Sequence, residues 1–95
     1  MRFGKYETRD RPHPAGSSGI QCLIFFPNGY GASIVKFYGS YGFEKGLWEM
    51  AVLKGSYEKD WTLTYDTSIT NDVLGYLSEE EVEKYLDEVQ RLSPL

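Results

Sequence analysis

The sequence predicts an α+β domain in which a four-stranded antiparallel meander carries one C-terminal amphipathic helix packed on a face. Three observations support this prediction. Short β-favouring runs alternate with glycine-containing turn sequences between residues 20 and 66. An apolar stripe with helical spacing follows near the end of the chain. The length of 95 residues suits one domain with a modest core.

The N-terminal residues 1–19 are expected to form an extended arm that can be mobile, with the single α+β domain at residues 20–95. The arm has two prolines and two glycines between residues 12 and 19 and few apolar residues. Phe3 and Tyr6 are the side chains of the arm that could dock on the domain.

Four strands are expected in the domain, and the sequence between the first two indicates a hairpin. Asn28 and Gly29 form the pair that favours a type I′ turn, whose two central residues need positive φ. The last strand shows the clearest alternation, with Trp61, Leu63 and Tyr65 on one face. The expected strands are residues 20–26, 32–38, 47–54 and 61–66.

The helix is expected at about residues 79–92. Ser78 and Glu81 have the spacing of a capping box at its start, and Pro94 ends it. A single stripe of apolar residues predicts the face that packs on the sheet. That stripe consists of Val82, Tyr85, Leu86, Val89 and Leu92.

Composition narrows the class of protein. The formal net charge is −4, and it is uneven: residues 1–57 carry seven Lys/Arg and four Asp/Glu, whereas residues 58–95 carry three and ten. A net acidic chain is poorly suited to direct nucleic-acid binding, which relies on phosphate contacts. One cysteine excludes an internal disulfide, and no apolar run is long enough to cross a membrane. We therefore expect a cytoplasmic protein.

No catalytic, cofactor-binding or metal-binding residues are predicted. The glycines of residues 28–46 fit neither a dinucleotide fingerprint nor a P-loop and indicate turns. The residues from Asp66 to Asn71 superficially resemble a calcium loop but lack its glycine, so Asx/ST-type turns are expected. Cys22 lies in an apolar strand as a buried, inert thiol, and His13 lies in the arm. These features favour a protein that is not an enzyme.

Two surfaces are candidates for binding a protein partner. The first is aromatic and lies in the glycine-rich turns. The second is the acidic face of the helix, which would dock on a basic surface. The candidate residues are Tyr30, Tyr41 and Phe43 in the turns and Glu80, Glu83 and Asp87 on the helix.

The stretches "NGYGASIV", "LWEMAVLKG" and "YDTSITNDVLGYLSEEEVEKYL" together resemble a family of small, uncharacterised bacteriophage and prophage proteins, over about residues 25–90. The resemblance implies an accessory phage-type protein in the cytoplasm of a bacterial host, and we expect it to act by binding a host or phage protein. Inhibition of a host defence or nucleic-acid-processing complex is the most specific version of this expectation. It carries over no functional residues. One alternative is a phage structural or assembly component that self-associates as a homo-oligomer through a sheet edge. Another is a binder of single-stranded nucleic acid that uses tyrosine stacking.

Overall fold

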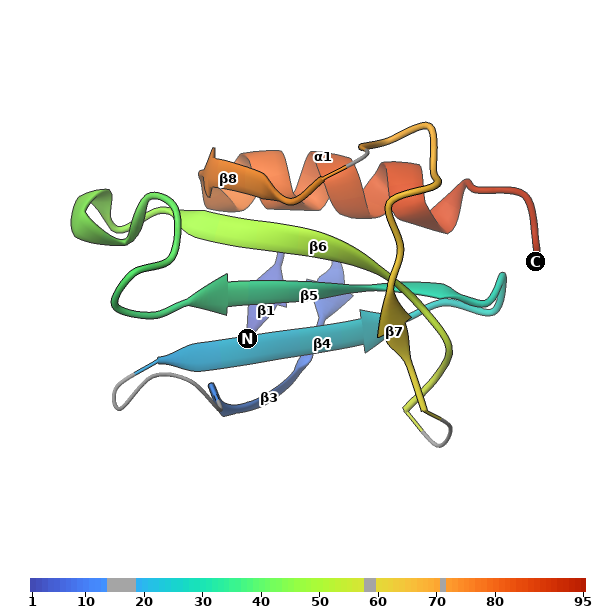
Figure 1. Ribbon diagram of the computed structural model, residues 1–95, viewed down its shortest axis with the longest axis horizontal. Coiled ribbons are helices and arrows are strands. Elements are labelled where there is room, and N and C mark those ends of the chain that lie inside the picture. Colours follow the sequence, from blue (N-terminus) through green and yellow to red (C-terminus); the bar gives the residue numbers. More distant parts are fainter. Residues whose placement is uncertain (14–18, 58–59, 71) are drawn as a thin grey trace.

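The computed structural model describes residues 1–13, 19–57, 60–70 and 72–95, and it combines an antiparallel sheet with one C-terminal helix (Figure 1). This confirms the predicted α+β class. In chain order the elements are β1 (Arg2–Phe3), β2 (Tyr6–Glu7), β3 (Arg9–Pro12), β4 (Ile20–Phe25), β5 (Tyr30–Lys36), the 3₁₀ turn η1 (Phe43–Lys45), β6 (Trp48–Lys54), β7 (Thr62–Leu63), β8 (Leu74–Leu77) and α1 (Glu79–Gln90).

The main sheet has six strands, so the prediction of four was wrong. Its order is β3-β4-β5-β6-β7, and β8 pairs with β6 beside β7. The two short strands share one edge of β6, with β7 opposite Leu53 and Lys54 and β8 opposite Trp48 and Met50. Sequence reasoning missed β3 because all its side chains are exposed and carry no apolar alternation. For the segment that forms β8, the sequence left open a helical turn or a short extended piece, because Gly75 interrupts a short apolar run.

The predicted hairpin between β4 and β5 is present, but its turn differs from the expected type I′. The N–H of Gly29 donates to the carbonyl of Phe26, and the N–H of Phe26 donates to the carbonyl of Tyr30. Gly29 has a φ of 91°, and Asn28 is not among the residues with positive φ. The loop is therefore a three-residue turn closed by a glycine in the left-handed region.

Asn28 also joins this turn to the end of the helix. Its Nδ2 lies 2.9 Å from the carbonyl oxygen of Val89 and 3.1 Å from that of Leu92. Val89 lies in the last turn of α1 and Leu92 lies two residues beyond its end, where the carbonyls no longer have the regular helical acceptor pattern. The Val89 carbonyl also accepts the N–H of Leu92 at 3.2 Å. The hairpin turn therefore caps α1 from outside.

The helix prediction is confirmed in its start and in its buried stripe. The hydroxyl of Ser78 accepts the N–H of Glu81 at 3.1 Å, and the N–H of Ser78 donates to the Glu81 carboxylate at 3.0 Å. Val82, Leu86 and Val89 have no exposed surface. Tyr85 and Leu92 are partly buried against the same core. The stripe thus packs against the sheet, which a helix of this length needs for stability in water.

The two faces of the sheet differ, because even-numbered and odd-numbered residues of β4, β5 and β6 point to opposite sides. Cys22, Ile34 and Met50 are paired neighbours in the register and are fully buried under the helix. We call this side the covered face and the other the uncovered face. At one end of the uncovered face the ring of Phe25 packs on Tyr57 and Trp61, with centroids 4.8 and 6.3 Å apart.

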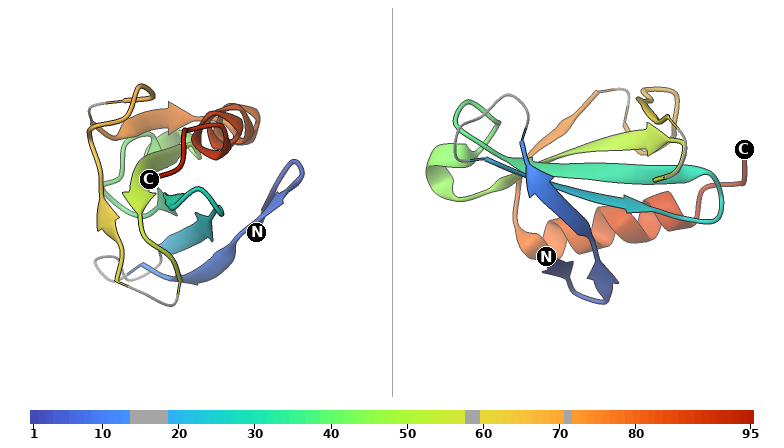
Figure 2. Two further views of the ribbon diagram at one scale, coloured as in Figure 1. Left: turned by 90° about the vertical axis from the view of Figure 1, so that its right-hand side faces the viewer. Right: turned by 90° about the horizontal axis from the view of Figure 1, so that it is seen from below.

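The N-terminal segment packs on the rest of the domain through Phe3 and Tyr6, the two side chains of the expected arm that could dock there. Phe3 and Tyr6, in the β1–β2 hairpin, have exposures of 0% and 6%, and Phe3 meets the edge of Trp48 with centroids 5.1 Å apart. Strand β3 then pairs with β4. Figure 2 shows the hairpin and α1 on the same side of the sheet. The two aromatic side chains anchor this segment because they complete the covered face. Residues 14–18 of the predicted arm lie outside the described residues.

Candidate functional site

The structure separates Tyr30 from the other two aromatic candidates. Tyr30 begins β5, pairs with Lys54 and packs partly buried against the core. Tyr41 and Phe43 follow the other end of β5, in the loop that leads to β6. The turn before β5 and the loop after it lie at opposite ends of the sheet (Figure 1). Only Tyr41 and Phe43 therefore share one surface.

The loop at residues 37–47 is built by tight turns, as its glycines predicted. The hydroxyl of Ser40 donates to the carbonyl of Phe37 at 2.8 Å and accepts the N–H of the same residue at 3.1 Å. Gly42 has a φ of 93°, and a Cβ there would lie 2.9 Å from the Leu47 side chain and 3.0 Å from the Tyr76 backbone. Glycine is required at this position for both reasons. The loop is consequently a defined platform for its aromatic side chains.

Four aromatic side chains gather at this end of the molecule, and we call them the aromatic rim. Tyr38, Tyr41 and Tyr76 have 88%, 57% and 52% of their surface exposed. The Tyr41 and Tyr76 rings stack with centroids 6.4 Å apart, and Tyr38 meets the edge of Phe43 at 6.0 Å. Large tyrosines left in water at one place are typical of binding surfaces rather than of cores. The rim consists of Tyr38, Tyr41, Phe43 and Tyr76.

Tyr76 was not among the predicted residues, and its backbone is unusual. Its φ of 58° is the only positive value at a non-glycine residue in the described part of the chain. Its N–H donates to the carbonyl of Tyr41 at 3.3 Å, and a Cβ on the preceding Gly75 would lie 2.6 Å from the Tyr41 Cβ. A bulky residue in this conformation costs on the order of 1–3 kcal/mol and is found mainly at functional sites. The sequence signal was only a Gly-Tyr pair in a segment of ambiguous structure.

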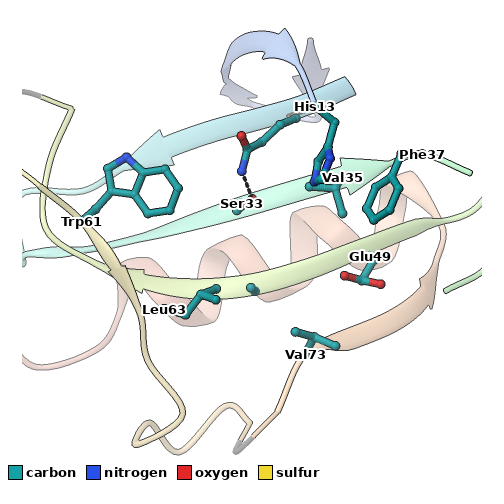
Figure 3. A pocket seen from close by; sticks show the side chains of 10 residues that line it. His13, Ser33, Val35, Phe37, Glu49, Trp61, Leu63 and Val73 are labelled. Carbon is teal, nitrogen blue, oxygen red and sulfur yellow. Dashed lines mark hydrogen bonds between the residues drawn. The ribbon is translucent and has the colours of Figure 1, made fainter. Parts of the chain in front are cut away.

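A cleft of about 270 Å³ lies next to the rim on the uncovered face (Figure 3). Val35 and Ala51 come from the central strands, and Phe37 lies at one end of the cleft and Trp61 at the other. The remaining apolar contacts come from Leu63 and Val73. Four polar side chains also line it, namely His13, Gln21, Ser33 and Glu49.

The polar floor of the cleft is a buried pair of side chains. Gln21 and Ser33 are 7% and 6% exposed, and the amide Nε2 of Gln21 donates to the Ser33 hydroxyl at 2.9 Å. The amide oxygen of Gln21 accepts from Nε of Arg11 at 2.7 Å. The ring of His13 stacks on Phe37 with centroids 4.0 Å apart. These contacts hold the floor and one end of the cleft in place.

Glu49 connects the cleft to the aromatic rim. It lies on β6 beside Phe37 in Figure 3, and its Oε1 accepts the backbone N–H of Tyr41 at 3.0 Å. The cleft and the rim are therefore one continuous surface. Sequence reasoning did not single out Glu49, because an isolated acidic residue in an alternating strand is indistinguishable from a solvent-facing one.

The acidic helix candidates are largely engaged by the chain itself. Asp87 accepts hydrogen bonds from the hydroxyl of Tyr6 and lies 3.2 Å from Nζ of Lys5. The Tyr6 hydrogen bond, followed by the Lys5 contact, lowers the pKa of Asp87 from its ordinary value. Glu83 accepts the backbone N–H of Lys5 at 3.3 Å. Of the three predicted residues, only Glu80 remains exposed without a contact from the β1–β2 hairpin among the described residues.

The structure also bears on the thiol, the histidine, the threonine-rich turns and the metal site that the sequence raised as candidates. Cys22 is buried on the covered face, and burial raises its pKa to about 12, which fits the predicted inert thiol. His13 lines the cleft on the opposite face, so the two do not form a pair. The hydroxyls of Thr64, Thr67 and Thr70 each accept the N–H two residues on, as predicted for turns of the Asx/ST type. Within the described ranges, no three His, Cys, Asp or Glu side chains gather as a metal site.

Comparison with known proteins adds no relative: no family model, no curated protein and no solved structure matches this chain. Among the described residues, no helix has the length and apolar character needed to span a membrane.

Proposed function

We propose that this protein acts by binding another protein, without catalysis, and that the aromatic rim and the cleft form the contact surface. The observation that carries the proposal is the rim itself. Tyr38, Tyr41 and Tyr76 are mostly exposed, yet they stand on a loop and a strand whose backbones are fixed by turns and hydrogen bonds. Tyrosine offers a large contact area at low cost in side-chain entropy, so it is enriched where affinity is concentrated.

The charge of the molecule supports a protein partner over a nucleic acid. The formal net charge is −4, and a carboxylate, Glu49, is the charged group that joins the rim to the cleft. The net negative charge and the Glu49 carboxylate would both repel the phosphates of a nucleic acid. A partner with a basic surface would be attracted by both, which speeds association.

The phage-type origin remains part of this proposal. The resemblance to small phage and prophage proteins favours an accessory protein that binds a host or phage protein, and the most specific version is inhibition of a host defence or nucleic-acid-processing complex. Such partners commonly carry basic surfaces because they handle nucleic acid. The net charge of −4 and the carboxylate of Glu49 support that pairing.

The experiment is a quantitative pull-down from bacterial lysate at low salt, with the wild type, the double variant Tyr38→Ala/Tyr41→Ala and the control Tyr65→Ala. Tyr65 is 45% exposed and lies outside the rim, so the control removes a similar ring elsewhere. Each captured protein is then purified and its binding to the three chains is measured directly. We expect one stoichiometric partner whose affinity falls at least tenfold in the double variant and is unchanged in the control.

Equal recovery by all three chains would contradict the proposal. Light scattering and a gel-shift assay with short single-stranded DNA and RNA test the alternatives in parallel. A defined homo-oligomer dissociated by the double variant would replace the proposal with self-assembly. A mobility shift that depends on Tyr38 and Tyr41 would replace it with nucleic-acid stacking.

A further inference from the structure

The cleft contains one charged group in surroundings that are otherwise mostly apolar. Of the described side chains that line it, Glu49 is the only one from an Asp, Glu, Lys or Arg residue. Its Oε1 accepts the N–H of Tyr41. The ion pairs among the described residues involve other carboxylates, at Glu7, Asp10 and Asp87. The carboxylate of Glu49 therefore keeps most of its hydrogen-bonding capacity for an outside group.

Any partner that covers the cleft removes Glu49 from water. An apolar side chain would leave the carboxylate buried and unpaired, which is strongly unfavourable. A phosphate or a carboxylate of the partner would be repelled. A cation with several N–H donors would restore the lost hydrogen bonds and the charge balance at once. The charge of the cleft thus selects a cationic occupant.

The size of the cleft limits that occupant to about one side chain. Its volume of about 270 Å³ is below the roughly 300–1,000 Å³ that sites for whole small molecules occupy. One face of the Phe37 ring is stacked on His13, and the ring also lies beside Glu49, where it can contact a planar cation (Figure 3). A guanidinium is planar, stacks on aromatic rings and is less strongly hydrated than an ammonium, so arginine fits these features better than lysine.

We propose that the cleft receives an arginine side chain of the protein partner; this inference rests on the proposed function and names the group that the partner must supply. The guanidinium pairs with the Glu49 carboxylate and lies against Phe37, and the methylene stem lies over Val35 and Ala51. The aromatic rim then contacts the residues on either side of that arginine.

The chain contains an internal example of the same chemistry. The guanidinium of Arg11 lies over the ring of Trp61 at 5.7 Å, and its Nε donates to Gln21 at 2.7 Å. Arg11 is not among the residues that line the cleft. One end of the uncovered face thus already binds a guanidinium through a ring and an amide. At the other end, Phe37 offers a ring in place of Trp61, and the Glu49 carboxylate is a stronger hydrogen-bond acceptor than the amide of Gln21.

The test is a titration of the ¹⁵N-labelled protein, followed by NMR, with the blocked tripeptides Gly-Arg-Gly, Gly-Lys-Gly and Gly-citrulline-Gly. Citrulline has the shape of arginine without its charge. We expect the arginine peptide to shift signals of the β5 and β6 residues at the cleft with a Kd on the order of 1 mM. The lysine peptide should bind more weakly, and the citrulline peptide should not bind measurably.

Two variants and one control locate the interaction. Glu49→Gln keeps an oxygen for the Tyr41 N–H and removes the charge, and it should weaken arginine binding about tenfold. Phe37→Leu keeps the site apolar without the ring and should weaken it by a few-fold. Glu44→Gln removes an exposed carboxylate of η1 outside the cleft and should leave the affinity unchanged.

Equal binding of the arginine and citrulline peptides would overturn the inference, as would shifts confined to the acidic helix or tighter binding of the lysine peptide. These results are independent of the pull-down. If the partner is lost from the Tyr38→Ala/Tyr41→Ala chain but is bound equally by Glu49→Gln, the proposed function holds and the arginine pocket is wrong. If arginine binds in the cleft and no partner depends on the rim, the pocket holds and the proposed function is wrong.

Discussion

The two faces of this sheet are made by the same three central strands, yet they have opposite chemistry. On the covered face Cys22, Ile34 and Met50 are sealed under α1 and the β1–β2 hairpin. On the uncovered face, the residues that directly precede these three in the chain are Gln21, Ser33 and Glu49. Their side chains are hydrogen-bonded and line the cleft. Alternation along a strand thus places the helix-covered apolar core on one side and a cleft with polar groups, the proposed contact surface, on the other. Changes on the two sides should therefore differ in kind.

The largest loss of stability should come from the covered face. Leu86→Asp places a charge at a fully buried site of the helix stripe, which should cost about 5 kcal/mol or more of the free energy of unfolding. That approaches the whole stability of a typical small domain. Circular dichroism and thermal melting measure the effect. An unchanged melting temperature would mean that the helix does not seal this face.

A smaller loss is expected where the N-terminal hairpin meets the helix. Tyr6→Phe removes a hydroxyl that donates to Asp87 and lies 2.8 Å from the side-chain oxygen of Gln90, and we expect a loss of about 1–2 kcal/mol at neutral pH. Urea unfolding of the variant and the wild type measures it. No difference between them would show that the hairpin contributes nothing through this hydroxyl.

The wild type and the Tyr6→Phe variant should also differ in how their stability responds to high pH. Burial, and then the hydrogen bond to Asp87, raise the pKa of Tyr6 from its ordinary value of 10.0 to about 12. The folded state therefore prefers the neutral phenol. The stabilisation that this gives is complete below the ordinary pKa and is lost as pH rises toward the folded value. The stability advantage of the wild type over Tyr6→Phe should shrink across that window, and an advantage that stayed constant would contradict the assignment.

On the uncovered face a polar pair should behave as a unit. Ser33→Ala leaves the buried amide of Gln21 without the acceptor that it has at 2.9 Å, which should cost about 1 kcal/mol. The double change Gln21→Leu/Ser33→Ala removes both partners and should recover most of that loss. Urea unfolding of the two single variants and the double variant gives the coupling energy. Strictly additive effects would show that the pair does not interact.

The smallest effect on stability should come from the rim. Tyr41→Ala removes a ring that is 57% exposed and should change the free energy of unfolding by about 0.5 kcal/mol or less. Its effect should instead appear in the affinity for the partner. A large loss of stability would place Tyr41 in the core and would remove the distinction between the two faces.

The parts that local chemistry determines could be predicted from the sequence. The capping box at Ser78 and Glu81, the apolar stripe of the helix and the central strands β4, β5 and β6 depend on neighbouring residues. The structure has the capping box where it was expected and the three strands within two residues of their expected bounds. Strand β3 could not be predicted, because its place in the sheet comes from backbone pairing with β4 and not from side-chain alternation.

The candidate site was predictable only in part, for the same reason. Tyr41 and Phe43 could be singled out because the glycine turns around them are visible in the sequence. Tyr76 comes from a distant strand and Glu49 from the strand that follows the loop, and only the fold of the chain brings both of them beside Tyr41. Likewise, nothing local to Glu83 or Asp87 shows that the β1–β2 hairpin contacts both of them.

The left-handed backbone of Tyr76 has a consequence for anyone who engineers this protein. Its φ of 58° suits glycine or asparagine, so a search for thermostabilising substitutions would select this position early. Tyr76→Gly should relieve the local strain and raise the melting temperature, and the same change would delete one ring of the rim. Selection for heat resistance alone would therefore yield a more stable protein that has lost part of the proposed contact surface.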